Sequence, residues 1–320
     1  MEKTLELTGL SIEDVNLSYK NLINLLTQLD PNVRFDIANS IWYRQSTMPL
    51  DEFLNRCRDY FCALVTGMDF SAPDAADIIN AWVDENTNGK IEEIVKKPID
   101  PSIVMFLINA IYFKGAWTYQ FDPNDTEDDV FRLPDGTKKP CQMMEQRGFF
   151  RYLATDSFQA VDLPYGDGAF GMTIFLPYAA SGVDALIARL DPDTLVYWIN
   201  CFFGDSGDVY LPKFKLEYEL GLNDVRSSLG MEIAFTPGAA DFSRMYEYAD
   251  IWIDSVLHKT FVEVNEEGTE AAAATAVSME LGPQPAGFWF RADHPFVFMI
   301  RENGSGTILF IGRIMDPGSA

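Results

Sequence analysis

The chain has 320 residues, of which 48% are hydrophobic and 13% aromatic, so it can bury the core of one large domain or two ordinary ones. It carries 48 Asp and Glu against 24 Lys and Arg, a formal charge of −24, which argues against nucleic acid and anionic membrane surfaces as partners because both select basic patches. No apolar run reaches ~18 residues, so we predict no transmembrane helix. The first ten residues, MEKTLELTGL, show no signal-peptide pattern.

The cysteines and histidines do not form the spacing of a metal site. The four cysteines are Cys57, Cys62, Cys141 and Cys201, and the chain has only two histidines. This set does not assemble a zinc constellation and favours buried free thiols. We therefore predict neither a metal nor a cofactor.

The first part of the chain is predicted to alternate between helices and strands. Residues 12–29 repeat apolar side chains at helical spacing and end at Asp30-Pro31, while 35–45 read as a strand. Residues 50–70 read as helix, turn and strand. A Ser/Pro/Asp start signal opens a helix over 71–91 that stops at Asn88-Gly89.

Residues 103–113, IVMFLINAIYF, are almost continuously apolar, which predicts a central strand covered on both faces. The rest of the chain reads mostly as strands and turns. The clearest strands are expected at 170–177, 209–220, 294–302 and 307–317, with short helices at 183–190 and 222–230. There are no repeats and no domain linker in the pattern, so the class is α+β with a large sheet.

Motifs of enzyme chemistry are missing from the sequence. It has no G-x-S-x-G, H-E-x-x-H, P-loop or C-x-x-C motif, and the glycines of GDGAFG (166–171) precede a strand instead of opening a helix. His258 and His294 lie in apolar, strand-like stretches, which favours structural histidines over catalytic bases. The residues therefore argue against an enzyme.

The segment VEVNEEGTEAAAATAVSMELGPQPAGFWF (262–290) contains four consecutive alanines. Ala and Glu favour a helix over 266–279. The alternation equally fits a half-buried strand, since every second residue from Thr269 to Met279 is small or apolar and both Glu270 and Glu280 fall on the other face. The pattern alone leaves helix and latent strand open.

This segment resembles the hinge of the reactive-centre loop of the serpins, a family of serine protease inhibitors. Further matches occur in family order along essentially the whole chain. They are INAWVDENTNGKI (79–91), LINAIYFKGAWTYQF (107–121), VDLPY (161–165), MTIFLP (172–177), YLPKFKLE (210–217), ADFSRM (240–245), LHKTFVEVNEEGTEAA (257–272) and ADHPFVFMIRENGSGTILFIGRIMDP (292–317).

The resemblance implies one serpin domain over residues 1–320. The expected fold has a large central mixed β-sheet, two further sheets, surrounding helices and an exposed reactive-centre loop at about 266–291. The chain begins at an internal position of the family pattern, so we expect it to lack the usual first strand and first two helices, which pack behind the central sheet and complete its shutter.

The resemblance also implies a suicide-substrate mechanism. A protease cleaves the loop, becomes acyl-linked to it, and is trapped when the hinge enters the central sheet. The implied hinge residues are Glu266, Gly268, Thr269, Ala271, Ala272, Ala273, Ala274 and Thr275. The inward set has neither bulk, charge nor proline, which favours an active inhibitor over a non-inhibitory serpin-like binding or chaperone protein or an inactive fragment.

Three further positions carry over from the family pattern. Asn109 and His258 match the shutter, where a buried polar pair is expected beneath the sheet strands that part. Trp117 matches the breach at the top of the sheet, next to Lys114 and Gly115.

The family pattern does not give a single position for the scissile bond. Family spacing counted from the two ends of the loop gives cleavage after Gly282 or after Gln284, and either bond would be followed by a proline, a poor leaving group for serine proteases. Cleavage between Leu281 and Gly282 avoids this and offers an apolar anchor. We predict that bond, with cleavage after Met279 as the second choice.

The expected partner is an elastase- or chymotrypsin-like serine protease, with a cysteine protease as a second class. No Lys or Arg lies between Lys259 and Arg291, which argues against a trypsin-like target. We expect a monomer that binds neither nucleic acid nor membrane, at an extracellular or cell-surface location.

Overall fold

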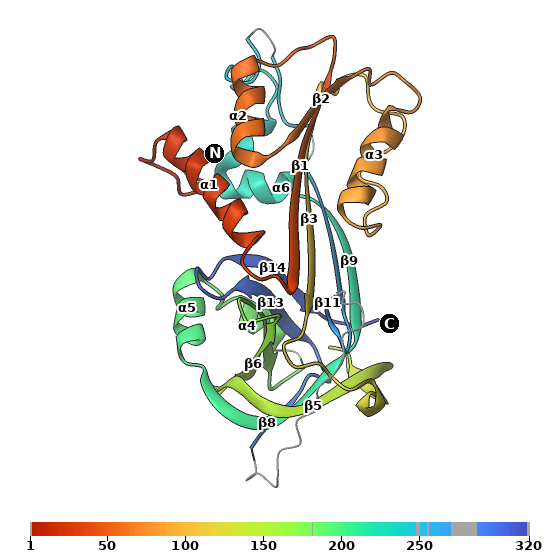
Figure 1. Cartoon of the computed structure of the whole chain (residues 1–320), viewed down its shortest axis with the longest axis vertical. Helices are drawn as coiled ribbons and strands as arrows, with labels where there is room; N and C mark the ends of the chain where they lie inside the picture. The colour runs from red at the N-terminus through yellow and green to blue at the C-terminus, as the bar shows by residue number, and fades with distance from the viewer. Residues whose placement is uncertain (1, 181, 248–249, 255, 270–286, 319–320) are drawn as a thin grey trace. The chain divides into compact units, whose positions relative to one another are not determined.

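The computed structural model describes residues 2–180, 182–247, 250–254, 256–269 and 287–318 (Figure 1). Its α-helices are α1 (Ile12–Leu26), α2 (Asp51–Phe61), α3 (Ala75–Asn86), α4 (Val183–Ile187), α5 (Pro192–Asn200) and α6 (Asn223–Arg226). Its strands are β1 (Val33–Arg44), β2 (Leu64–Met68), β3 (Met105–Ala116), β4 (Glu127–Arg132), β5 (Lys138–Ala154), β6 (Phe158–Tyr165), β7 (Phe170–Pro177), β8 (Phe203–Pro212), β9 (Phe214–Gly221), β10 (Leu257–Val264), β11 (Gly268–Thr269), β12 (Phe288–Arg291), β13 (Phe296–Glu302) and β14 (Ile308–Ile314).

The strands form two sheets. One is six-stranded, in the order β2-β1-β3-β11-β10-β9, and the other is eight-stranded, in the order β12-β8-β5-β6-β7-β13-β14 with β4 paired to β5. Both contain parallel and antiparallel pairs, as the predicted mixed α+β class requires.

The chain divides into two compact units, which are described separately. Unit 1 comprises Met1–Gln28, Phe35–Tyr112 and Glu217–Phe261, and unit 2 comprises Leu29–Arg34, Phe113–Leu216 and Val262–Ala320.

The core of unit 1 lies between α3 and the strands beside it. Ile79 and Val83, one turn apart on α3, are buried in one cluster with Trp42 of β1 and Ile108 of β3. The helix ends as the sequence predicts, because Asn88 and Gly89 both have a positive φ, of 55° and 76°.

Strand β3 corrects the expectation of a strand covered on both faces. Ile108, Ala110 and Tyr112 are buried, whereas Leu107 is 63% exposed and Asn109 is exposed. The strand is central in the sheet, and its face toward the cluster around α3 is covered. The opposite face is exposed at Leu107 and Asn109 and buried only farther along, at Phe113. The continuous apolar run therefore did not indicate which face of the strand packs against other elements.

Other element boundaries also differ from the prediction. Helix α1 ends at Leu26 instead of Leu29, and its cap residue Thr27 bonds back to the carbonyl of Ile23. The expected strand over 209–220 is two strands, β8 and β9, which belong to different sheets. Lys213 separates them, and its amide donates to the carbonyl of Gln142 at 2.8 Å.

The eight-stranded sheet of unit 2 is held together by the 17-residue strand β5. Met143 to Tyr152 of β5 pair with β8, and Arg151 to Ala154 pair with β6. The two further sheets expected from the sequence are therefore continuous through this strand.

Strands β7 and β13 form the buried middle of unit 2, since every one of their residues is buried. β13 contains two buried charged side chains: Arg301, whose guanidinium donates to the carboxylate of Asp162 at 2.8 Å, and Glu302, whose carboxylate accepts from the amide of Ser305 at 2.6 Å. These partners satisfy charges that burial alone would penalise heavily.

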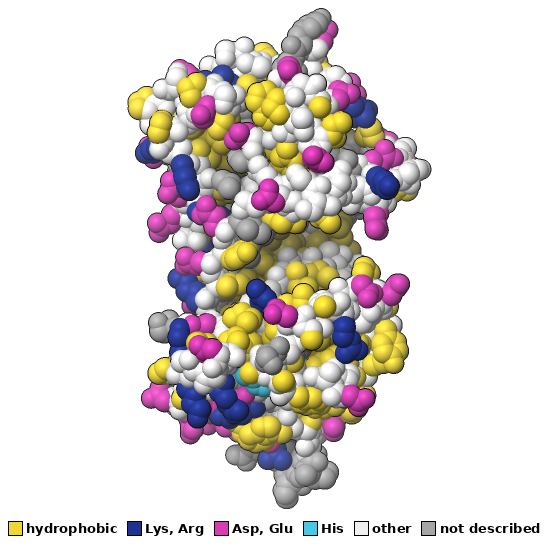
Figure 2. All heavy atoms as spheres, turned by 180° about the vertical axis from the view of Figure 1, so that it is seen from behind, with side chains coloured by type: hydrophobic (Ala, Val, Ile, Leu, Met, Phe, Trp, Pro, Cys, Tyr) yellow, Lys and Arg dark blue, Asp and Glu magenta, His cyan; other side chains and the backbone are white. Residues whose placement is uncertain are grey.

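The cysteines are all free, and of the four only Cys141 is buried while Cys62 is exposed. None of the helices in the described residues is long and apolar enough to cross a membrane. On the face that Figure 2 shows, Asp and Glu side chains are scattered among other types instead of forming one block.

Candidate functional site

The turn between β10 and β11 places the start of the predicted hinge. The amide of Asn265 donates to the carbonyl of Gly268 at 3.0 Å. The side-chain oxygen of Asn265 also accepts from the amides of Glu267 at 3.0 Å and Gly268 at 3.2 Å. One asparagine thus organises the turn with both its backbone and its side chain, as Asx turns do.

Gly268 occupies a position that only glycine fits. Its φ is +149°, and it pairs with Ala116 while Thr269 pairs with Gly115 of β3. A Cβ at Gly268 would lie 2.1 Å from the carbonyl oxygen of Gly115, which belongs to the backbone and cannot rotate away. The residue is therefore required by space as well as by conformation.

Thr269 is the first hinge side chain inside the sheet. It is buried, and its hydroxyl lies 2.6 Å from that of Tyr165. Its backbone pairs with β3 on one side and with Val264 of β10 on the other. Burial raises the pKa of Tyr165 far above its ordinary value, more than the bond to Thr269 lowers it, so the phenol stays neutral.

Trp117, the predicted breach residue, contacts both Tyr165 and the hinge turn. Its ring stacks on Tyr165 with centroids 4.4 Å apart, and its indole N–H donates to the carbonyl of Asn265 at 3.0 Å. Its backbone amide donates to the carbonyl of Glu267 at 2.9 Å. The tryptophan therefore holds the hinge turn through both its side chain and its backbone. The sequence singled out the VDLPY motif but gave Tyr165 at its end no role.

Glu266 is anchored by two side chains from distant segments. Its carboxylate accepts from the hydroxyl of Thr126 at 2.9 Å and lies 3.1 Å from the ammonium group of Lys213. Burial acts to raise the pKa of Glu266. Hydrogen bonds from its own backbone amide, Thr126 and Lys213, together with the charge of Lys213, outweigh burial and hold that pKa below its ordinary value. No local sequence signal pointed to Thr126 or Lys213.

The predicted shutter is seen only in part. Asn109 is exposed instead of buried, because no described residue covers β3 at this position, and its amide donates to the side-chain oxygen of Asn39 at 2.8 Å. The side chain of His258 lies outside what the structure describes. A pair between the two stays a prediction.

The rest of the predicted loop lies largely outside the described residues. This applies to the hinge residues Ala271, Ala272, Ala273, Ala274 and Thr275, to Met279, and to the expected scissile pair Leu281 and Gly282. The two ends of the predicted loop are strands, β11 and β12, and β12 pairs in parallel with β8. The segment that reads as a loop therefore starts in one sheet and ends in the other.

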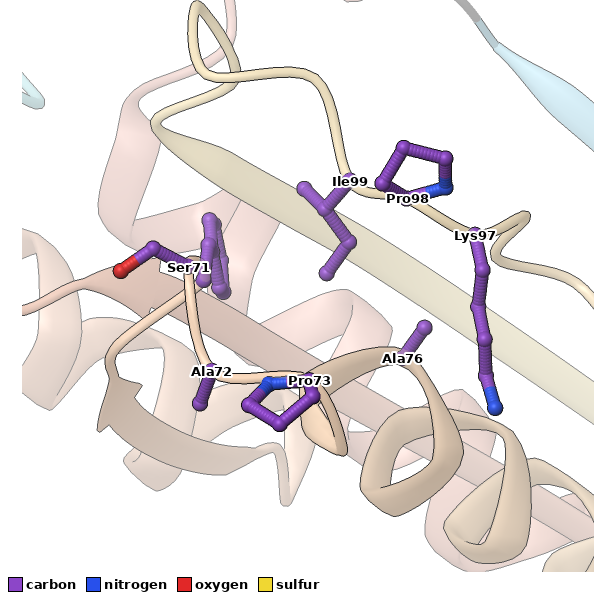
Figure 3. Close-up of a pocket in the computed structure, with 8 residues that line it drawn as sticks. Ser71, Ala72, Pro73, Ala76, Lys97, Pro98 and Ile99 are labelled. Carbon is purple, nitrogen blue, oxygen red and sulfur yellow. The ribbon is translucent and has the colours of Figure 1, made fainter.

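A separate pocket of about 410 Å³ lies in unit 1, at the start of α3. In Figure 3 the side chains of Ala76 and Ile99 point into the space between the helix and residues 97–99. Lys97 at its rim forms an ion pair with Asp77. None of the predicted site residues lines this pocket.

The described residues contain no group of three or more His, Cys, Asp or Glu side chains that could hold a metal ion. His294 has a structural environment, with one ring nitrogen 2.8 Å from the carboxylate of Asp293 and the other 2.6 Å from the carbonyl of Pro177.

Comparison with known proteins identifies the family. The family model described as Serpin (serine protease inhibitor) matches residues 1–317. Serpin B10 of Rhinolophus ferrumequinum is 34% identical over 324 residues, covering 99% of this chain and 81% of the relative. Leukocyte elastase inhibitor A of Rattus norvegicus is 35% identical over 321 residues, covering 96% and 84%.

A solved structure agrees with these sequences. The thermophilic serpin tengpin, in its native state, matches with a TM-score of 0.87 and 32% identity, over 98% of this chain and 81% of that one. The chain therefore belongs to the serpin family, and the predicted family and fold are confirmed.

The first prediction concerns Gly268. Gly268→Ala adds a Cβ that must displace backbone, so we expect the free energy of unfolding to fall by about 3 kcal/mol. Urea denaturation measures it. The matched control is Gly221→Ala, where no atom lies within 4 Å of the added Cβ, and the change should stay within about 0.5 kcal/mol. A Gly268→Ala chain as stable as the control would contradict the close approach to Gly115.

The second prediction concerns pH. A carboxyl whose pKa is lowered by folding stabilises the protein above its unfolded pKa and loses that contribution as pH falls through its folded pKa. Glu266→Gln should therefore lower the free energy of unfolding by about 1–2 kcal/mol at pH 7. The difference from the unmodified chain should shrink once pH falls below the ordinary value of 4.5.

Urea titrations from pH 7 to pH 3 measure this difference. Glu127→Gln, at an exposed position of β4, serves as the control and should show little difference at any pH. A Glu266→Gln effect that is independent of pH would show that the carboxylate charge is not what holds this residue.

Proposed function

We propose that this chain inhibits serine proteases as a suicide substrate. The active-site serine of the protease attacks the carbonyl of Leu281, the bond to Gly282 breaks, and the amine of Gly282 leaves as a new N-terminus. The acyl-enzyme is then carried with the hinge as the hinge enters the six-stranded sheet between β3 and β10. In this account the chain traps the enzyme and supplies no catalytic site, metal or cofactor of its own.

One observation carries the proposal: the first hinge residues already form a strand within that sheet. β11 pairs with β3 on one side and β10 on the other, and Thr269 is buried there. Extension of β11 would add backbone pairs with both neighbours, which is the way extended segments bind to sheets. Only small or apolar residues follow Thr269 at every second position as far as Met279.

The length of the loop suits this movement. Thirteen residues run from Thr269 to Leu281, and as a strand they span about 40 Å. That is similar to the 12 residues of β3, along which the inserted segment would lie. Cleavage at Leu281 therefore frees enough chain for one full strand.

The proposed targets are elastase- and chymotrypsin-like enzymes. Leu281 offers an apolar side chain to a hydrophobic specificity pocket. A relative that is 35% identical is named an inhibitor of leukocyte elastase, which agrees with this choice. A cysteine protease remains the second class of target, and a monomer is the proposed form.

The expected extracellular or cell-surface location gains no support from the comparisons, because the names of the matched relatives carry no location. It is not part of the proposed function.

The third prediction is a covalent complex. Incubation of the chain with pancreatic elastase or with chymotrypsin should give a band that survives denaturing electrophoresis and equals the enzyme plus most of this chain. Mass spectrometry should find the released peptide beginning at Gly282. Complete cleavage without such a band would show a substrate and not an inhibitor.

The matched variants separate trapping from cleavage. Thr269→Arg places a charge at a buried position beside Tyr165, so insertion should fail and the loop should be cleaved without trapping. Glu270→Arg, on the opposite set of the alternation, should still form the complex. Equal complex formation by both variants would rule out insertion as the trapping step.

A further inference from the structure

Two large aromatic side chains are exposed on the outer face of strands β5, β8 and β12 in unit 2. Trp289 of β12 is 54% exposed and Phe149 of β5 is 65% exposed. Trp289 pairs with Asp208 of β8, and Asp208 pairs with Arg147 of β5. Since side chains of paired residues point to the same face, these four residues belong to one surface, which we call the outer aromatic surface.

The opposite face of the same strands is already the core. Phe150, Val209 and Phe290, the sequence neighbours on the three strands, are buried. The two outer aromatic rings therefore lie outside the buried core, and among the described residues they contact those of their own face. Exposed Trp and Phe lose the stabilisation that burial would supply, so their presence here requires another explanation.

Both rings are held in place by their neighbours. The ring of Phe149 lies over Gly204, where a Cβ would be 2.5 Å from it. The ring centroids of Trp289 and Tyr210 lie 4.5 Å apart, and the guanidinium of Arg291 lies over the Tyr210 ring, 4.9 Å from its centroid. Side chains ordered before binding lose less entropy when a partner arrives.

The polar residues between the rings complete the composition of a protein interface. Arg147 lies 3.6 Å from Asp208, and its side chain is 62% exposed. Trp, Phe and Arg are the residues enriched in protein–protein interfaces, and Trp and Arg dominate their energetic centres.

The position of this surface in the chain indicates its occupant. Only six residues separate Leu281 from Phe288, where β12 begins, and they span at most roughly 20 Å. A compact enzyme of about 200 residues has a radius of gyration of roughly 16 Å. A protease that holds the bond between Leu281 and Gly282 therefore has its own surface within reach of Trp289.

We propose that the outer aromatic surface is a docking site for the body of the protease whose active site holds the loop. This rests on the proposed function and adds a second contact to it. The docking site strengthens the first, reversible complex, before any bond is broken, and so selects among enzymes that would all accept Leu281.

The test uses the full chain and a protease that cannot cleave. Pancreatic elastase and chymotrypsin with the active-site serine replaced by alanine are immobilised, and dissociation constants are measured by surface plasmon resonance. For the Phe149→Ala/Trp289→Ala double variant we expect binding at least ~10-fold weaker than for the unmodified chain with one of the two enzymes. The control, Val196→Ala/Tyr197→Ala, removes two equally exposed side chains from α5 of the same unit and should change binding less than ~2-fold.

The outcomes separate the docking site from the inhibitor. Unchanged affinity of the double variant for both enzymes overturns the docking site, even where the unmodified chain forms a covalent complex with active enzyme. Weaker binding of the double variant supports the docking site, even where active enzyme yields no covalent complex and the proposed inhibition fails.

Two further readouts protect the interpretation. Thermal midpoints and circular dichroism of the variants should match the unmodified chain, which excludes misfolding as the cause. Size-exclusion chromatography should show the same species for all of them. A loss of self-association in the double variant alone would assign the surface to a second copy of this chain and overturn the docking proposal.

Discussion

The close approach of Gly268 to the end of β3 is the constraint on which the rest of the site depends. Because Gly268 has no side chain, its backbone can lie against Gly115 and Ala116, where a Cβ would overlap a carbonyl oxygen. This contact sets where β11 begins, and so directs Thr269 inward to the hydroxyl of Tyr165. The backbone path at the start of the hinge is therefore fixed within two residues.

The anchoring of Glu266 links this contact to the junction between the sheets. Lys213, which holds the carboxylate, is the residue between β8 and β9, where the chain passes from the eight-stranded to the six-stranded sheet. The same eight-stranded sheet receives β12 at the other end of the loop. The segment 270–286 is thus flanked by a paired strand on each side, β11 and β12. A cut within it would leave each half attached to its own strand.

Much of this could be predicted from sequence because the signals are local. Alternating small residues and one glycine are readable over a few positions, and the motifs of the family occur in order along the chain. Helix α5 was not predicted, although its start signal is equally local, since Asp191 caps it and Pro192 opens it.

What could not be predicted depends on residues far apart in the sequence. Thr126 and Glu266 are separated by 140 residues, and no pattern along the chain pairs them. The exposure of Leu107 and Asn109 has the same origin, because an apolar run indicates burial but not which neighbour supplies it. Contacts between distant segments, and the burial of one face of a strand, are set by the tertiary structure. They determine which side chains hold Glu266 and which residues of β3 are exposed.

The most direct measurement of the central claim is a crystal structure of the chain after its loop has been cleaved by elastase. The account predicts that β11 continues beyond Thr269 as a full strand between β3 and β10, with Ala271 and Ala273 on the same side as Thr269. A cleaved chain in which β11 still ends at Thr269, with the freed segment outside the sheet, would contradict it.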